Sequence, residues 1–204
     1  IVKSKTTFDT KAIVVGGTIS PLHTHNAIVF HLVSEQTAHT AELAVGFGRK
    51  VRNLVATSDY QAIFPTKLSS DSKAAGRWNT NKGGDYFAIG VGGAVTGKGA
   101  DVLIIDDPHS EQEAALGAYN PDVYDKVYEW YTSGPRQRLQ PGGAIIVVMT
   151  RWSVRDLTGQ IMKSATQREG ADDWEIIEFP AIMPSGDPLW PEFWPLEQLE
   201  SLRA

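Results

Sequence analysis

Two short, uninterrupted runs of aliphatic residues constrain the fold of this chain more than any other feature. The first is VLII at residues 102–105 and the second is AIIVVM at residues 144–149. Unbroken runs of this length, rich in β-branched residues, are typical of strands buried on both faces of a parallel sheet. Residues 122–139 lie between them and predict a helix, because apolar and aromatic residues recur there at helical spacing. These residues are Tyr124, Val127, Tyr128 and Tyr131. Strand, helix and strand in this order predict a right-handed parallel crossover and an α/β fold.

The same patterns predict further elements along the chain. Residues 40–56 form an expected amphipathic helix, with Leu43, Phe47, Val51, Leu54 and Val55 facing inward and Arg49, Lys50 and Arg52 facing outward. The other expected elements are strands at 27–33 and 174–179, short strands or a hairpin at 86–90 and 92–95, a helix at 156–163 capped by Ser153, an ordered connector at 188–195 and a helix at 196–203.

The composition excludes several classes of protein. The chain has 204 residues, enough for one substantial domain, and no cysteine, which excludes disulfides and thiolate-bound zinc. A net charge of −5 does not indicate a nucleic-acid-binding domain, and the apolar runs are far shorter than the roughly 20 residues of a membrane span. Most of the histidines lie within residues 23–39, without the HExxH spacing of a zinc site. The chain has no signal peptide and begins at Ile1, so we expect a fragment of an intracellular protein.

Two adjacent aspartates, Asp106 and Asp107, directly follow the first aliphatic run. Ligands of open parallel sheets lie beyond the carboxyl ends of the strands, so both carboxylates are expected at a ligand site. This is the Walker B arrangement, in which the first acid, Asp106, holds Mg²⁺ and the second, Asp107, positions or deprotonates the attacking water. Two bare carboxylates side by side repel each other, which favours a bound metal. The alternative is an ordinary acidic turn that Pro108 ends.

Three more candidate residues flank the aliphatic runs. Residues 92–98 spell GGAVTGK, but Gly99 stands where a P-loop needs Ser or Thr, and a strand follows where a helix is needed. We therefore reject this segment as a Walker A motif, while Lys98 remains a candidate for contacting phosphates. Thr150 directly follows the second run, where its hydroxyl can bind a γ-phosphate or the attacking water; the alternative is an ordinary threonine at a strand end. Arg151 is either a phosphate or DNA contact or a structural partner of nearby acids.

Three sequence blocks resemble the large terminase subunit of tailed bacteriophages. They are GGDYFAIGVGGAVTGKGADVLIIDDPH at 83–109, PGGAIIVVMTRWSVRDLTG at 141–159 and PLWPEFWPLEQLESLRA at 188–204. Residues 36–55 are similar to the unit that follows the P-loop in this family, so the resemblance covers about residues 36–204. It implies a parallel-sheet, P-loop NTPase-like fold of the ASCE class, a three-layer sandwich. It also implies a motor that uses ATP and Mg²⁺ to pump DNA into a procapsid.

The resemblance also implies an organisation and residue roles. Residues 1–35 are unlike the family, 36–187 correspond to the ATPase core after the Walker A motif, and 188–204 correspond to the connector toward a nuclease domain. Asp106 falls at the Mg²⁺-binding position, and Asp107 stands where many relatives carry a catalytic glutamate one methylene longer. Thr150 falls in the motif that couples hydrolysis to movement. Lys98 falls where relatives carry a basic residue that senses or stabilises the phosphates, and Arg151 is a candidate nucleotide contact.

The partners are implied in the same way. They are double-stranded viral DNA, the portal protein, the small terminase subunit and further copies of the chain in a homo-oligomeric ring, in the host cell cytoplasm and without a membrane. The DNA contacts are unassigned. The basic surfaces at residues 49–52 and at Arg136 and Arg138 are candidates, or are merely solvated charges.

The chain also departs from the family. No complete P-loop motif occurs upstream of the acids, and the nuclease domain is missing. Without the P-loop, the β- and γ-phosphates lose their cradle, so we expect weak ATP binding and little turnover by this chain alone. Residues 26–31, NAIVFH, are faintly similar to the closing block of an intein, with Thr37 as the residue after the splice junction. A rearranged or frameshifted gene, or simply a divergent strand, are the alternatives.

Three functional hypotheses remain. The leading one is a piece of a DNA-packaging ATPase. The second is another ASCE motor such as a helicase, which shares the strand-end acids but not the Pro- and Trp-rich tail. The third is a non-catalytic remnant that binds the portal or the small subunit as an assembly module, which the missing Walker A motif favours.

Overall fold

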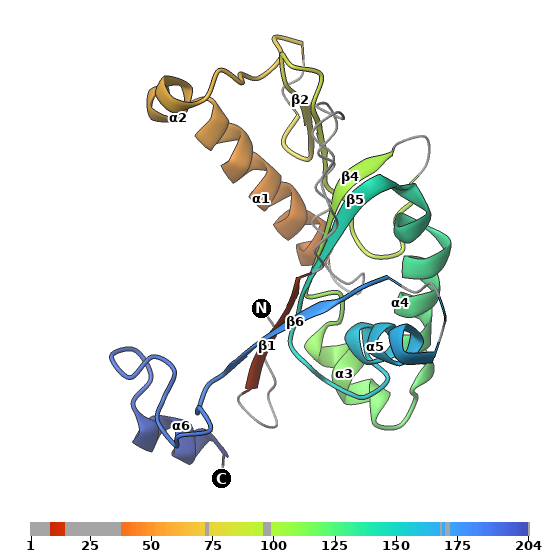
Figure 1. The fold of residues 1–204 in the computed structure, drawn as a ribbon, viewed down its shortest axis with the longest axis vertical. Helices are drawn as coiled ribbons and strands as arrows, with labels where there is room; N and C mark the ends of the chain where they lie inside the picture. The colour runs from red at the N-terminus through yellow and green to blue at the C-terminus, as the bar shows by residue number, and fades with distance from the viewer. Residues whose placement is uncertain are drawn as a thin grey trace.

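The computed structural model describes residues 9–14, 38–71, 74–95, 99–167, 169 and 172–203. One sheet has the strand order β4-β5-β1-β6, and a second consists of β2 and β3 (Figure 1). The elements in chain order are β1 (Asp9–Val14), α1 (Ala38–Val55), α2 (Ser58–Ile63), β2 (Arg77–Asn79), β3 (Asp85–Phe87), β4 (Ala100–Asp106), α3 (Glu111–Gly117), α4 (Asp122–Ser133), the 3-10 turn η1 (Pro135–Arg138), β5 (Leu139–Val148), α5 (Leu157–Gln167), β6 (Glu175–Pro180) and α6 (Leu196–Arg203). The strand predicted at residues 27–33 lies outside the described residues.

The two aliphatic runs form β4 and β5, which pair in parallel as predicted. Their register aligns Val102 with Ala144 and continues to Asp106, which lies opposite Val148. Alternate side chains of both strands are almost fully buried; these are Leu103, Ile105, Ile145 and Val147. The core therefore lies at this strand pair, with α4 and α5 packed against it.

The sheet as a whole is mixed, which corrects the prediction of a parallel sheet. Strand β1 runs antiparallel to both of its neighbours, β5 and β6. Hydrophobic patterning reports how far a strand is buried but not its direction, and β1 comes from a segment, DTKAIV, that is not among the predicted strands. The structure therefore supports a mixed α/β fold in which the parallel pair of β4 and β5 forms one side of the sheet. The complete three-layer ASCE sandwich remains a prediction.

Helix α4 buries the side that the sequence indicates but is shorter than predicted. Tyr124, Val127 and Tyr131 are buried at the expected spacing. The helix ends at Ser133 rather than at residue 139, because Pro135 disfavours helical geometry in Gly134, the residue before it. The following residues tighten into η1 and lead directly into β5.

The expected short strands at residues 86–90 and 92–95 are only partly confirmed. Strand β3 forms, but it pairs with β2 rather than with residues 92–95, which form a turn and an irregular segment. The pair is stabilised by Trp78 and Tyr86, whose rings stack in parallel with their centroids 4.8 Å apart. A Trp beside a Tyr across an antiparallel pair is a favourable arrangement that the sequence spacing alone did not identify.

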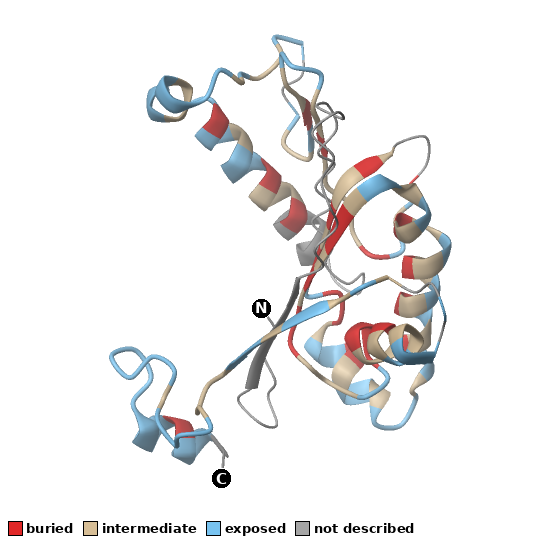
Figure 2. Ribbon diagram, in the orientation of Figure 1, coloured by how far each residue is buried: buried red, intermediate tan, exposed pale blue. Residues whose placement is uncertain are grey.

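Helix α1 forms where predicted but buries only part of the predicted face. Ala44, Gly48 and Val55 are buried, whereas Val51 and Leu54 are 41% and 58% exposed. Figure 2 shows buried and exposed positions alternating along this helix. The reason is close packing at Gly48, whose carbonyl accepts a hydrogen bond from the Trp78 indole at 3.1 Å. Small residues therefore set the contact face, and half of the apolar stripe stays outside it.

The C-terminal elements agree with the sequence. Strand β6, helix α6 and the turns between them occupy the expected segments, and these turns are held by backbone bonds such as Leu189 to Ala181. Among the described residues, no helix combines the length and apolar character that crossing a bilayer requires.

The packing at Gly48 predicts opposite effects of one substitution at two helix positions. A Cβ at Gly48 would lie 2.6 Å from the carbonyl oxygen of Ala75 and 2.7 Å from Tyr86 Cε1, so Gly48→Ala should lower the free energy of unfolding by about 1–3 kcal/mol. A Cβ at Gly46 meets nothing within 4 Å, so Gly46→Ala should raise it by about 0.5–1 kcal/mol through helix propensity. Urea unfolding followed by circular dichroism measures both; a change of the same sign in both variants would contradict this packing.

Candidate functional site

The candidate site lies at the carboxyl end of the β4–β5 pair. Asp106 is the last residue of β4, and the backbone N–H of Asp107 donates to the carbonyl of Val148 at 2.8 Å. Asp107 Oδ1 accepts a hydrogen bond from the backbone N–H of Thr150 at 3.0 Å. The structure thus brings together three predicted site residues, Asp106, Asp107 and Thr150, although Asp107 and Thr150 are 43 residues apart in the sequence.

Asp107 adopts an unusual backbone conformation. Its φ of +40° places it in the left-handed region, and it is the one non-glycine residue with a positive φ in the part of the chain that the structure describes. Aspartate tolerates this region better than most residues, at a cost of roughly 1–2 kcal/mol. The hydrogen bonds to Val148 and Thr150 are of comparable size and offset the strain. The turn directs the Asp107 carboxylate toward the end of β5.

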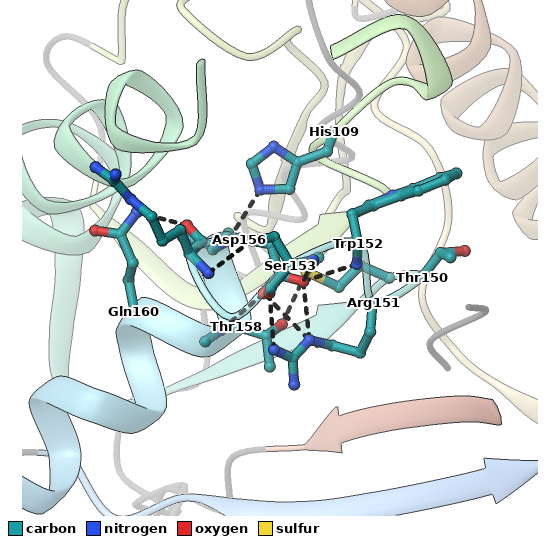
Figure 3. A network of polar contacts seen from close by, with 12 residues as sticks. His109, Thr150, Arg151, Trp152, Ser153, Asp156, Thr158 and Gln160 are labelled. Carbon is teal, nitrogen blue, oxygen red and sulfur yellow. Dashed lines mark hydrogen bonds and ion pairs between the residues drawn. The ribbon is translucent and has the colours of Figure 1, made fainter. Parts of the chain in front are cut away.

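A second aspartate, Asp156, organises the loop between β5 and α5 (Figure 3). It is completely buried. Its Oδ2 accepts from the backbone N–H groups of Trp152 and Ser153 at 2.9 and 3.2 Å, and its Oδ1 accepts from that of Gly159 at 2.8 Å. Arg151 Nε donates to both oxygens, at 3.2 and 2.9 Å. The carboxylate therefore ties both ends of the loop together.

This network shows how Arg151 is held and which residue caps α5. Of the two interpretations of Arg151, the structure shows the ion pair with a nearby acid. Asp156, not Ser153, caps α5, because the Ser153 hydroxyl accepts instead from the N–H of Arg155 at 3.1 Å. Both serine and aspartate are common N-caps, so the sequence signal was present, but it pointed to two positions three residues apart.

His109 is a residue of the site that sequence reasoning missed. It is 3% exposed, its Nε2 accepts from the backbone N–H of Leu157 at 2.9 Å, and its ring meets that of Tyr124 edge-on. Burial lowers the pKa of His109 to about 4, although the charge of Asp156 acts to raise it. The imidazole is therefore neutral, and since Nε2 accepts, Nδ1 carries the proton. The only sequence signal was its place directly after the strand-end acids and Pro108.

Asp107 and His109 together form a double tether between two loops. The loop after β4 holds the start of the β5–α5 loop through Asp107 and Thr150, and its end through His109 and Leu157. The two loops are therefore fixed to each other at both ends, next to the strand-end acids.

Two other residues predicted from the sequence, Lys98 and Arg136, are not part of this arrangement among the described residues. Lys98 lies outside the described residues. β4 begins at Ala100, directly after Gly99, so a strand and not a helix follows GGAVTGK, as the rejection of a Walker A motif requires. Arg136, one of the candidate DNA contacts, forms a bidentate ion pair with Asp172, in which Nε donates to Oδ2 at 2.7 Å and Nη2 donates to Oδ1 at 2.5 Å.

Two cavities among the described residues lie beside α5 and away from Asp106. One, of about 820 Å³, is lined by Arg151, Arg155 and Lys163 among others. The other, of about 410 Å³, contains the Arg136–Asp172 pair. Neither includes the strand-end acids in its lining.

Asp156 and Asp125 allow a matched test of burial. Both aspartates pair with an arginine, but Asp156 is fully buried, whereas Asp125 and its partner Arg155 are about half exposed. Asp156→Asn should lower the free energy of unfolding by about 3 kcal/mol, because Arg151 loses its partner and the new amide group faces N–H donors. Asp125→Asn should lower the free energy of unfolding by less than about 1 kcal/mol, because this ion pair is exposed to solvent. Chemical denaturation measures both, and equal losses would be incompatible with the buried network.

The burial of His109 predicts a pH dependence of stability. In the unfolded chain this imidazole binds a proton below its ordinary pKa of 6.5, whereas in the folded chain it does so only below about 4. Protonation between these values favours the unfolded state, so this contribution is complete above pH 6.5 and is lost as the pH falls toward 4. Between pH 7 and pH 5, titration of His109 should lower the free energy of unfolding by about 2 kcal/mol. In His109→Gln, which cannot titrate, the decrease over this range should be smaller by that amount; an identical decrease would contradict the assignment.

Comparisons with known proteins add little to this geometry. No protein-family profile matches the chain, and no curated protein matches it. Among solved structures, the HK97 bacteriophage large terminase is similar, with a TM-score of 0.37 and 14% sequence identity over 73% of this chain and 28% of that chain. The chain thus corresponds to little more than a quarter of that terminase. At this TM-score we take neither a family nor an activity from the similarity.

Proposed function

We propose that this chain is part of an ATP-driven motor that packages viral DNA, and that Asp106 and Asp107 form the metal-binding half of its Mg·ATP site. The observation that carries the proposal is the hydrogen bond from the Thr150 N–H to Asp107 Oδ1. It joins two of the sequence blocks that resemble the ATPase core of large terminases. It does so at the edge of a parallel strand pair beyond which ligands bind in α/β folds.

Asp106 is the residue that we assign to Mg²⁺. It is half-buried at the end of β4, and its carboxylate is the kind of hard oxygen donor that Mg²⁺ prefers. One or two carboxylates suffice when substrate phosphates complete the coordination. Among the described residues, no group of three or more His, Asp or Glu side chains could hold a metal ion. When bound, Mg²⁺ would neutralise charge on the transferred phosphoryl group.

Asp107 and Thr150 are assigned to water positioning and to coupling. The carboxylate of Asp107 is exposed and is held toward β5, where it can orient a water molecule. Because the backbone of Thr150 holds this carboxylate, a displacement of Thr150 would move Asp107 as well. We propose that hydrolysis and movement of the β5–α5 loop are linked through this bond.

Lys98 and Arg151 have subordinate parts in the proposal. The phosphate contact of Lys98 rests on its position in the sequence, just before β4. Arg151 is bound to Asp156, so its main proposed part is to hold the loop that carries Thr150, with a nucleotide contact second. Viral DNA, the portal protein, the small terminase subunit and a homo-oligomeric ring remain proposed partners.

A non-catalytic assembly module is the second candidate function. The sequence of residues 1–204 contains no complete P-loop motif, so it supplies no recognisable cradle for the β- and γ-phosphates. A chain with the acids but without the cradle is expected to bind Mg·ATP weakly. In this alternative, the strand-end acids would have only a structural part.

Isothermal titration with Mg·ATP tests the proposed site. We expect weak, saturable binding that Asp106→Asn weakens at least about tenfold, a loss of about 1.4 kcal/mol, because the neutral amide no longer attracts the cation. Asp101→Asn, the same substitution at the other end of β4, should leave binding unchanged. Binding that both variants weaken equally, or neither weakens, would refute the assignment of Asp106. The absence of binding at millimolar nucleotide would favour the assembly module.

A further inference from the structure

Two cavities adjoin along helices α4 and α5, which pack against each other (Figure 1). Their linings share Tyr128 and Ser164, so the cavities lie on either side of these two residues. Their volumes are about 820 and 410 Å³, whereas small-molecule sites have volumes of roughly 300–1,000 Å³. Neither lining contains Asp106 or Asp107, so both cavities are separate from the proposed Mg·ATP site.

The larger cavity is basic, although the chain as a whole has a net charge of −5. Its lining contains one acid, Asp125, and three cations, Arg151, Arg155 and Lys163. Lys163 is exposed and forms no ion pair among the described residues. Asp156 binds Arg151 through Nε, so the guanidinium is held in place while its Nη1 has no partner in the described part of the chain. Guanidinium and ammonium groups gathered in this way are suited to binding phosphate.

Arg155 can contact a ligand although it is paired with Asp125. Both side chains are about half exposed, and an ion pair this exposed contributes little to stability. A phosphate group therefore competes with the Asp125 carboxylate at small cost. Asp125 keeps a partner when it does, because Gln160 Nε2 also donates to it at 3.3 Å.

The smaller cavity is aromatic and carries no excess of positive charge. Three rings line it, those of Tyr128, Tyr131 and Trp174. The side chains of Tyr128 and Trp174 are half-buried, so part of each ring is accessible. Arg136 and Asp172 neutralise each other, and Glu169 adds a negative charge, which would repel a phosphate. A planar aromatic ring therefore suits this cavity, because it can stack on the side-chain rings and form hydrogen bonds with the Arg136–Asp172 pair at its edge.

We propose that these two cavities together bind a free nucleotide, with its phosphates in the larger cavity and its base in the smaller one. A nucleotide is a ligand in which a polyanionic group and a planar aromatic ring are joined, and the two cavities meet at Tyr128 in the same way. The basic side chains offset the phosphate charge, so binding at this site does not require Mg²⁺. The site is additional to the one proposed at Asp106, and it does not depend on the proposed function.

Isothermal titration of the full chain in EDTA tests the proposal, because chelation removes the metal on which the site at Asp106 depends. ADP serves as the probe, since every base has an aromatic face and stacking tolerates differences between bases. Pyrophosphate represents the phosphate part alone, and adenosine represents the base and sugar alone. We expect ADP to bind at least about tenfold more tightly than either, because only ADP occupies both cavities.

Two variants distinguish the two cavities. Lys163→Gln should weaken the binding of both ADP and pyrophosphate at least about tenfold, because both lose a charge-assisted contact. Trp174→Leu should weaken the binding of ADP by a similar factor and leave that of pyrophosphate unchanged, because the ring contacts the base alone. Lys126→Gln and Trp190→Leu, the same substitutions at exposed positions that line neither cavity, are the matched controls and should change nothing. Lys163 is exposed, so its variant tests the proposal even where the replacement of Trp174 disturbs folding.

Asp106→Asn separates this proposal from the proposed Mg·ATP site. The variant should bind ADP in EDTA as tightly as the unchanged chain; weaker binding would show that ADP occupies the strand-end acids instead. Three other results would also overturn the proposal. They are no binding of ADP at millimolar concentration, binding of pyrophosphate as tight as that of ADP, which would indicate a simple anion site, and binding of a short single-stranded oligonucleotide without binding of ADP.

Discussion

The parallel pairing of β4 with β5 is the interaction on which the core and the candidate site both depend. Its register buries Leu103 and Ile105 beside Ile145 and Val147, and the same register places Asp106 opposite Val148. Side chains alternate along a strand, so a shift by one residue would expose this apolar set and would move the acids to the wrong side of the sheet. The register that buries the core therefore also fixes the position of the acids, and no additional contact is needed for this.

The two loops at the carboxyl end of the β4–β5 pair fix the part of the site that the strand register leaves free. Asp107 reaches Thr150 and His109 reaches Leu157, so the β5–α5 loop is held at both ends by the loop after β4. Asp156 holds the same loop from within. A buried carboxylate with this many donors is costly to disturb, because removal of either partner leaves an uncompensated charge. Movement at this edge of the sheet is thus expected to involve both loops as one body rather than Thr150 alone.

The sequence predicted those features that depend on local pattern. The runs that became β4 and β5, the buried face of α4 and the meeting of Asp106, Asp107 and Thr150 all follow from apolar periodicity and from parallel-strand geometry. The direction of β1, the partner of β3 and the buried face of α1 depend instead on contacts between distant segments. Gly48 is the clearest case: a side chain there would collide with the Ala75 carbonyl and the Tyr86 ring, and a hydrophobicity pattern does not detect this requirement for a glycine. The sequence did not predict the role of His109 for the same reason, because its partner is the backbone N–H of a residue 48 positions away.

The aspartates near the site are of two kinds, which differ in how far they are buried and in how many hydrogen bonds their carboxylates accept. Asp156 is completely buried, and its oxygens accept from three backbone N–H groups and from Arg151, which fills the roughly four lone-pair positions of a carboxylate. Such a group cannot also bind a cation, so its part is to hold the loop. Asp106 and Asp107 instead stand next to each other at a strand end, one half-buried and the other exposed. Adjacent carboxylates repel, and a divalent cation relieves that repulsion better than any rearrangement of a strand already fixed by its register. This difference is the physical reason why we propose ligand binding at Asp106 and Asp107, whereas Asp156 holds the loop.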